Sequence, residues 1–429
     1  MPARLTAAWR NGPLAIPSLR LLATGQFTST AGDYCYAVAL PWLVLSAHGG
    51  PVLLGTVLAC YGVPRTVFIP ADGVLADKIG PRTIMLAADA ARCALVVALT
   101  VLAAEHTASL AALGPVAALL GAGEGLFIPA SFSIMPSLLE PEHLAAGNAI
   151  NSAAVQAGTV AGPVLGGVLV ASAGTAAAFA VDAATFAVSA LSLALIRPRV
   201  AAEAARTGGG AAPASGNGAA DAEGGVWALL RRARILRIVV AVVIVANLAN
   251  GGTFDVALPA LAHARFGAGG YGALIACLGA GAVIGTLAAA SGGRAARPAL
   301  LDACAILIMA VSLALIPFLG GLPGAAAATF VLGACNGFGN TMFFTLLQRW
   351  APPGLLGRVM SVVMLAGLGT FPLSVAISGV LIRQIGPSLF FPVAGAMVAV
   401  AIVGALSQRE FRYFGSMPPR ESELDVAAA

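Results

Sequence analysis

The chain is poor in charged residues. Only 10% of its 429 residues are charged, whereas 59% are hydrophobic and the mean hydropathy is +0.93. Soluble globular domains carry roughly a quarter charged residues, because charges cover the water-facing surface. A chain of this length with so few charges cannot cover such a surface. Its composition therefore excludes an ordinary soluble domain and favours a protein that spans a lipid bilayer.

Residue types that build familiar enzyme and metal sites are scarce or isolated. Lys78 is the only lysine, and the absence of a GxxxxGK sequence around it excludes a P-loop ATPase. The four histidines show no HExxH spacing, and the six cysteines stand singly in apolar runs without a CxxC spacing. Local sequence offers no Ser/His/Asp set either. We expect no enzyme activity, no metal and no other cofactor, and we interpret the cysteines as small packing residues.

Apolar stretches long enough to cross a bilayer recur along the whole chain. A transmembrane helix needs about 20 mainly apolar residues. The first stretch follows Arg4, Arg10 and Arg20 and, at about 25 residues, is too long for the apolar region of a cleaved signal peptide. The candidates lie at 20–46, 52–75, 83–104, 109–135, 148–171, 175–196, 236–262, 270–291, 299–319, 324–348, 358–383 and 387–406. They predict an all-α, polytopic membrane protein with twelve transmembrane helices.

A polar interruption divides these spans into two sets of six. Residues 198–230 are rich in Ala, Gly, Ser and Glu, and they lead into Arg231, Arg232, Arg234 and Arg237. Such a composition is typical of a flexible linker, here with a short amphipathic helix at Trp227–Leu236. We predict an N-terminal six-helix bundle at 1–197, a cytoplasmic linker at 198–234, and a C-terminal six-helix bundle with a cytoplasmic tail at 235–429.

The distribution of positive charge predicts the orientation. If both termini are cytoplasmic, 19 of the 23 lysine and arginine residues fall in inner loops, and the exceptions are Arg65, Arg92, Arg265 and Arg383. Cytoplasmic loops carry such an excess of positive charge. This bias explains the net charge of +5 without a nucleic-acid partner. The high Ala, Gly and Arg content is typical of a GC-rich bacterial source, so we expect the bacterial cytoplasmic membrane.

Short sequences recur in the same order in the two halves. Three pairs share an offset of 212 residues and a fourth has 218, as follows: Gly80-Pro81-Arg82 and Gly292-Gly293-Arg294; Gly121 with Gly125 and Gly333 with Gly337; Gly167-Val168-Leu169 and Gly379-Val380-Leu381; Val38-Ala39-Leu40-Pro41 and Val256-Ala257-Leu258-Pro259. Parallel six-helix halves related by an axis along the membrane normal are the arrangement of major facilitator transporters.

The loop after the second span carries a motif of that superfamily. Gly73-Val-Leu-Ala-Asp77-Lys78-Ile-Gly80-Pro81-Arg82 resembles its G-x-L-a-D-r-x-G-r-r signature between helices two and three. Glycine permits close helix approach and a tight turn, and an acid there can face basic side chains or a helix N-terminus. The resemblance implies a cytoplasmic gate that latches when the transporter faces outward. An ordinary charged turn is the alternative.

The fifth span carries a second motif. Gly158-Thr-Val-Ala-Gly162-Pro163-Val-Leu-Gly166-Gly167 resembles the G-x-x-x-G-P-x-x-G-G signature of the antiporter and efflux branch, and 148–191 is similar to macrolide-efflux and siderophore-export relatives. Glycines on one face allow close helix packing, and the proline bends the helix. Generic helix packing is the alternative. Span four departs from proton-coupled drug exporters, since it reads Gly121-Ala-Gly-Glu124-Gly125 where they carry an arginine.

Ionisable residues inside spans are costly and mark function or pairing. At 1.5 Å per residue, Asp33, Arg65 and Glu124 lie about 20 Å into spans one, two and four, past the middle of a hydrocarbon core about 30 Å thick. We hypothesise that Asp33 and Glu124 belong to a site that alternates between a proton and cargo. A static pair such as Asp33–Arg65 is the alternative. For Asp89 and Arg92 a structural pair is favoured.

Further polar and aromatic residues inside the spans are weaker candidates. Asn247, Asn250, Asn336 and Asn340 are positioned either to contact cargo or to bond neighbouring helices. The phenylalanines that fit an apolar cargo pocket, or else face lipid, are Phe127, Phe132, Phe338, Phe343 and Phe344. Asp182 lies in the outer third of the sixth span and Asp255 near the outer end of the seventh, so both rank lower.

The sequence as a whole predicts a secondary transporter of the major facilitator fold that works by alternating access. The function it favours is proton-driven efflux of a hydrophobic or amphipathic small molecule, such as an antibiotic or siderophore. The expected partners are that molecule, protons and the lipid bilayer, with the protein as a monomer. A proton-coupled nutrient importer, a uniporter and a non-transporting sensor or assembly subunit are the alternatives.

Overall fold

The computed structural model describes residues 15–105, 109–140, 143–196, 234–292, 297–351 and 356–414. Within these ranges the chain is helical and contains no strand. A helix satisfies its own backbone N–H and C=O groups, which is why long apolar runs form helices in lipid. The predicted all-α class is confirmed. The predicted linker lies outside the described residues as far as residue 233.

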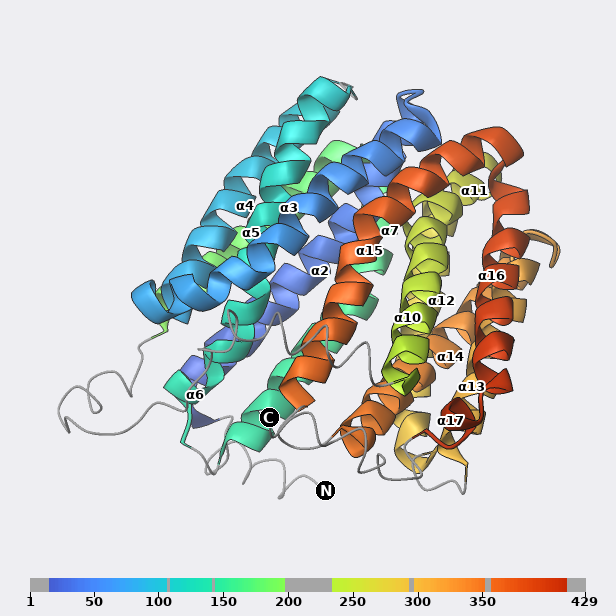
Figure 1. Ribbon diagram of the computed structural model, residues 1–429. Helices are drawn as coiled ribbons and strands as arrows, with labels where there is room; N and C mark the ends of the chain where they lie inside the picture. Colours follow the sequence, from blue (N-terminus) through green and yellow to red (C-terminus); the bar gives the residue numbers. More distant parts are fainter. Residues whose placement is uncertain are drawn as a thin grey trace, which may run out of the picture. The chain divides into compact units, whose positions relative to one another are not determined.

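Within each half of the chain the helices follow one another with short connections (Figure 1). In the first half they are α2 (Pro17–Ser46), α3 (Gly50–Ile79), α4 (Pro81–Ala104), α5 (Leu110–Ser133), α6 (Met135–Leu138) and α7 (Leu144–Leu195). In the second half they are α10 (Arg234–Gly252), the π-helical turn η3 (Thr253–Ala257), α11 (Leu258–Arg265), α12 (Gly267–Gly292), α13 (Pro298–Leu315), α14 (Gly321–Trp350), α15 (Leu356–Ile385), α16 (Pro387–Ser407) and α17 (Arg409–Arg412).

The described helices provide the twelve predicted spans. Ten helical segments among the described residues are long and apolar enough to cross a membrane. One of them, Ala146–Leu195, is 50 residues long and supplies two spans, because Gly174 interrupts it with a non-helical φ of 84° and ψ of 174°. The 30-residue α2 is also long enough, although Asp33 and neighbouring polar residues make it less apolar than the ten. α10, η3 and α11 form a single span.

Glycine and proline end one helix and start the next. Gly80 has a φ of 82° and is followed by Pro81 at the start of α4, and Gly386 has a φ of 79° and is followed by Pro387 at the start of α16. A positive φ suits glycine because it has no Cβ, and the fixed φ of proline suits the first turn of a helix. The turn predicted at Gly80 is confirmed by these angles.

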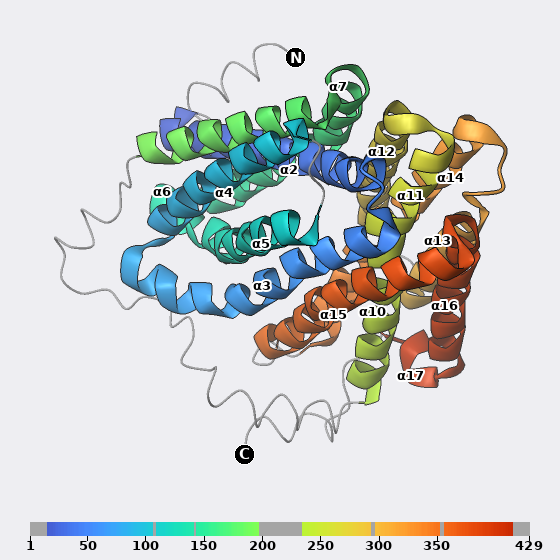
Figure 2. The same cartoon turned by 90° about the horizontal axis from the view of Figure 1, so that it is seen from above.

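The chain divides into two compact units. The first unit comprises residues 1–49 and 60–215, and the second comprises residues 50–59 and 216–429. The first ten residues of α3 thus group with the second unit, whereas the sequence analysis keeps all of 1–197 together. In the first unit α7 packs along α2 and α4, and α4 also contacts α5 (Figure 2). In the second unit α14 contacts α12 and α13, while α10 contacts α15 and α16.

The repeated glycines make the same kind of contact in both units. In the first unit, a Cβ atom at Gly121 would overlap the backbone of Tyr61 on α3, and one at Gly125 would lie 2.5 Å from the Arg65 carbonyl oxygen. In the second unit, Gly333 and Gly337 of α14 meet the backbone of α12 equally closely. Close backbone packing through small residues is a main source of helix association in lipid. The sequence repeat therefore corresponds to a repeated packing contact.

The glycines of the fifth span pack against the first. A Cβ atom at Gly158 would lie 2.8 Å from the Thr30 Cβ, and one at Gly166 would lie 3.0 Å from the Cys35 Cα. Between them, a Cβ atom at Gly162 would lie 2.5 Å from the Ala31 carbonyl oxygen. The regularly spaced glycines therefore allow close helix packing, as predicted. They hold α7 against α2, the helix that carries Asp33.

We predict that Gly162→Ala destabilises the protein, because the new methyl group has no space between α7 and α2. Such overpacking costs about 1–3 kcal/mol. The measurement is the temperature at which half of the detergent-solubilised protein is lost from the monodisperse gel-filtration peak. Gly404→Ala is the matched control, because a Cβ atom at that helical glycine would meet nothing within 4 Å. Equal melting of the two variants would contradict the packing role.

Candidate functional site

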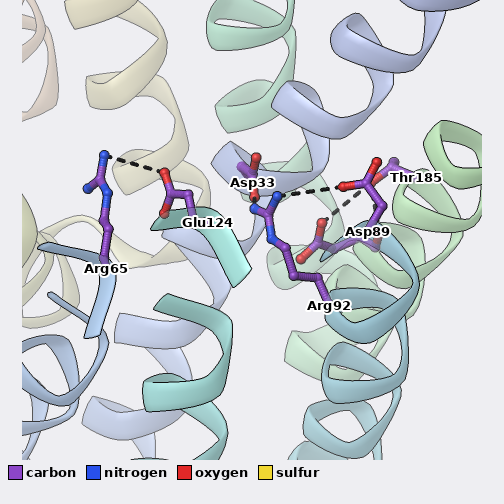
Figure 3. Close-up of polar contacts among 7 residues, drawn as sticks. Asp33, Arg65, Asp89, Arg92, Glu124 and Thr185 are labelled. Atoms are coloured by element: carbon purple, nitrogen blue, oxygen red, sulfur yellow. Dashed lines mark hydrogen bonds and ion pairs between the residues drawn. The ribbon is translucent and has the colours of Figure 1, made fainter. Parts of the chain in front are cut away.

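Arg92 is the centre of a charged cluster inside the first unit (Figure 3). Its residue is only 3% exposed, and its guanidinium carbon lies 4.2 Å from the ring centroid of Phe186. The absence of a side chain at Gly123 on α5 leaves room for its methylene groups, since a Cβ atom there would be 3.1 Å from the Arg92 Cγ. Aromatic faces attract a guanidinium group, so this setting holds the cation in an apolar interior.

Two carboxyl groups share this guanidinium. Arg92 Nη2 donates a hydrogen bond to Asp33 Oδ1 on α2, and Nη1 lies 3.8 Å from Asp89 Oδ1 one turn earlier on α4. The Asp89 side chain is fully buried, whereas the Asp33 side chain is 39% exposed. The predicted contact of Asp89 with Arg92 is present, and Asp33 extends the pair to a helix 59 residues away in sequence. Asp33 is thus the accessible end of a buried charge network.

A third carboxyl group belongs to the same place. Asp182 on the second part of α7 is 1% exposed and lines a cavity with Asp33, Arg92 and Tyr36. Its Oδ1 lies 3.4 Å from the Thr185 hydroxyl group, which donates to the Asp182 carbonyl oxygen. The cavity volume is about 10 Å³. That volume holds about one water molecule and excludes any cargo.

Arg65 and Glu124 form a separate ion pair in the first unit. Arg65 Nη2 on α3 lies 3.4 Å from Glu124 Oε1 on α5. Both side chains are mostly buried, at 23% and 19% exposed, and the glycine contacts between α3 and α5 bring them together. Arg65 therefore pairs with Glu124, and Asp33 forms its ion pair with Arg92. Although span four lacks the arginine expected of drug exporters, Arg65 supplies a cation beside its acid.

The motif after span two is only partly visible. Gly73, Asp77 and Lys78 fall within α3, but their side chains lie outside the described part. Arg82, in the first turn of α4, donates from Nε to the Leu193 carbonyl oxygen at 2.8 Å and from Nη2 to the Ala194 carbonyl oxygen at 2.7 Å. Carbonyl groups at a helix C-terminus have no partner within the helix. Arg82 thus ties the start of α4 to the end of α7.

The second unit contains a larger pocket formed by α10, α13, α14 and α15. Its volume is about 350 Å³, within the range that encloses drug-sized ligands. All four asparagines proposed from sequence line it, and so do Phe343 and Phe344. The lining residues are otherwise apolar or cysteine, and no charged residue is among them. The structure therefore groups the asparagines around one space.

The other three phenylalanines lie elsewhere. Phe127 is buried under Arg92, with the guanidinium carbon 5.7 Å from its ring centroid. Phe338 packs on the core of the second unit, and Phe132 is 78% exposed. Only the adjacent pair at the end of α14 therefore fits the predicted apolar pocket.

Two acids gain importance from the structure. Asp182 ranked low in sequence because it lies near the end of its span, yet it lines the small cavity beside Arg92. Asp302, near the start of α13, was not selected at all, and it is only 5% exposed. The available signal for Asp302 was its position 213 residues after Asp89, close to the 212-residue offset of the internal repeat.

Membrane-crossing helices that hold buried charges in one unit and a drug-sized pocket in the other define a multi-pass membrane protein of the transporter class. A model of the Major Facilitator Superfamily matches residues 22–368. The chain belongs to this superfamily. Membership in a transporter family also points to a protein that is not an enzyme.

Relatives and solved structures agree with this assignment. The chain is 25% identical to the uncharacterised MFS-type transporter y4rN of Sinorhizobium fredii, covering 91% of this chain and 95% of the relative. It is also 25% identical to the multidrug efflux pump Tap of Mycolicibacterium fortuitum, covering 98% of each. A bacterial homologue of the iron transporter ferroportin, in an inward-facing state, shares the fold with a TM-score of 0.70 at 17% identity, covering 94% of this chain and 100% of that one.

We predict that Arg92→Met strongly destabilises the protein, because it leaves the fully buried Asp89 without its cation. Breaking a buried pair in this way costs about 3–5 kcal/mol. Thermal loss of the detergent-solubilised protein measures the effect, and adding Asp33→Asn and Asp89→Asn should restore most of the stability. Arg234→Met is the control, since its pair with Glu410 is 57% and 41% exposed. Similar losses for both arginine variants would contradict the account.

Proposed function

We propose that this protein is a secondary transporter that exports a hydrophobic or amphipathic small molecule by alternating access, driven by the proton gradient. The observation that carries the proposal is that two spaces of different size and polarity lie in different units. Asp33, Asp182 and Arg92 line a cavity of about 10 Å³ in the first unit, whereas a pocket of about 350 Å³ without a charged lining residue lies in the second. The first space suits a proton or water, and the second suits cargo.

Charge counting supports the role of the small cavity. Asp33, Asp89 and Asp182 surround a single guanidinium group, which can neutralise one carboxylate. Unpaired charges are costly within the hydrocarbon region, so protons must balance the excess of acids. Asp33 is the accessible member, and it is our choice for the group that exchanges a proton with water. With Asp33 ionised, Arg92 would contact both Asp33 and Asp89. With Asp33 protonated, Arg92 would pair with Asp89 alone.

Glu124 and Arg65 are proposed as the second acid–base element. Glu124 Oε2 is buried and has no hydrogen-bond partner among the described residues. A change of its contact with Arg65 would alter how α5 lies on α3, because the two helices meet through Gly121 and Gly125. Proton exchange at Asp33 and rearrangement at Glu124 are therefore proposed as linked steps of one cycle.

Three arguments favour export over import. The complete glycine motif of span five resembles that of the efflux branch, and its glycines pack α7 on the helix that carries Asp33. The relative that matches 98% of the chain is described as a multidrug efflux pump. The pocket of the second unit has an apolar wall with a few amides, which suits amphipathic compounds better than sugars or peptides. Antibiotic resistance is the expected phenotype.

The proposed membrane arrangement follows the positive charges. We propose a monomer in the bacterial cytoplasmic membrane, with both termini and the linker 198–234 in the cytoplasm between bundles at 1–197 and 235–429. Gly73, Asp77, Lys78, Gly80 and Arg82 would form the cytoplasmic gate. The bonds from Arg82 to the end of α7 support a role in which this turn moves with the helix bundle.

We predict that expression in a drug-sensitive bacterium raises resistance to some macrolides, tetracyclines, phenicols or dyes, by at least fourfold in inhibitory concentration. Asp33→Asn should abolish that resistance while the protein still reaches the membrane, because a neutral amide cannot exchange a proton. Arg234→Met is the control for a charge change outside the site. Resistance retained in Asp33→Asn would remove Asp33 from the coupling mechanism. No resistance to any compound, with confirmed expression, would contradict drug export.

A further inference from the structure

The second unit holds one deeply buried acid at the edge of its pocket. Asp302 lies on α13, one turn before Ile306, which lines the pocket. Its Oδ1 faces Gly339 of α14, another lining residue, at 3.3 Å from the position of a Cβ atom. Asp302 is not itself a lining residue, but its carboxyl group lies against Gly339 and its helix carries Ile306, both of which line the space of about 350 Å³.

Asp302 lies 213 residues after Asp89, one position away from the 212-residue offset of the internal repeat, and no arginine follows it as Arg92 follows Asp89. The residues 212 and 213 positions after Arg92 are Cys304 and Ala305. Asp302 contacts no basic side chain in any ion pair or hydrogen bond recorded for the described residues. The first unit therefore supplies its own cation to the acid, whereas the second unit leaves an acid beside an open pocket.

The unpartnered polar atoms of this unit all accept hydrogen bonds. Among its described residues, the buried side-chain atoms without a partner are Asn250 Oδ1 and Asp302 Oδ1. Two of the four lining asparagines already use their amide nitrogen, since Asn247 Nδ2 donates to the Val243 carbonyl oxygen at 2.9 Å and Asn336 Nδ2 lies 4.0 Å from the Met309 sulfur. A buried acceptor without a donor is costly, so a ligand that brings N–H groups would be favoured.

We infer that this pocket binds the charged, N–H-bearing nitrogen group of an amphipathic cation, with Asp302 as its counter-charge and Asn250 as a hydrogen-bond acceptor. Phe343, Phe344 and the aliphatic wall would contact the apolar body of the same molecule, because they line the rest of the space. The inference rests on the proposed function, since it names the class of cargo. It selects cationic amines over anionic cargo such as acidic siderophores.

Rhodamine 123 and fluorescein test this inference, because they share a xanthene core and carry opposite charge at neutral pH. Fluorescence anisotropy with the purified full-length protein in detergent would give both affinities, with empty micelles as the blank. We expect rhodamine 123 to bind at least tenfold more tightly than fluorescein. Asp302→Asn should weaken rhodamine 123 at least tenfold, whereas the control Asp255→Asn, which changes another acid of the unit, should stay within threefold.

Several outcomes would overturn the inference. They are the lack of saturable rhodamine 123 binding to the wild-type protein, equal binding of the two dyes, and unchanged affinity in a monodisperse Asp302→Asn variant. A parallel efflux assay in cells separates this failure from failure of the proposed function. Export of neutral or anionic drugs without rhodamine 123 binding would support the proposed export function and contradict the cation site. Asp302-dependent binding of rhodamine 123 without export of any compound would support the cation site and contradict the proposed export function.

Discussion

The cost of charge in an apolar interior is the constraint on which this structure depends. Arg92 lies between Phe186 and Phe127, and the lack of a side chain at Gly123 leaves room for its methylene groups. Its guanidinium group is stabilised there because two carboxyl groups contact it. Removing a charge from water is expensive, and only close pairing offsets the expense. Because Asp33 lies on α2 and Arg92 on α4, their contact helps to hold these two helices together, whereas the contact with Asp89 stays within α4.

Small residues make those contacts reachable. Gly162 brings α7 against the helix of Asp33, and Gly125 brings α5 against the helix of Arg65. The second unit keeps the close packing, through Gly333 and Gly337, but lacks the arginine opposite Asp302. The first unit thus holds several acids around one arginine, and the second holds a pocket lined by asparagines and apolar side chains.

The sequence predicts the helices and their close packing better than it predicts which charged side chains form ion pairs. Apolar run lengths and glycine spacing predicted the helices and the close helix packing at Gly162, although not its partner helix, because both depend on local pattern and backbone geometry. The partner of Asp33 could not be predicted, since it depends on the rotation of α2 relative to α4, and that rotation results from packing along both helices. Asp302 was not predicted as a site residue, because an acid close to the start of a span cannot be distinguished by sequence from a charged residue in the preceding loop. Only the fold shows that it is buried beside a pocket.

The central claim is that the first unit handles the proton and the second handles cargo. Transport in proteoliposomes of a radiolabelled drug that the cells export tests it most directly, with the uptake driven by a pH gradient compared with the exchange of drug at equal pH. Asp33→Asn should abolish the gradient-driven uptake and keep the exchange, whereas Asn340→Ala, which alters the pocket, should impair both. Loss of exchange in Asp33→Asn, or loss of gradient-driven uptake alone in Asn340→Ala, would contradict this division.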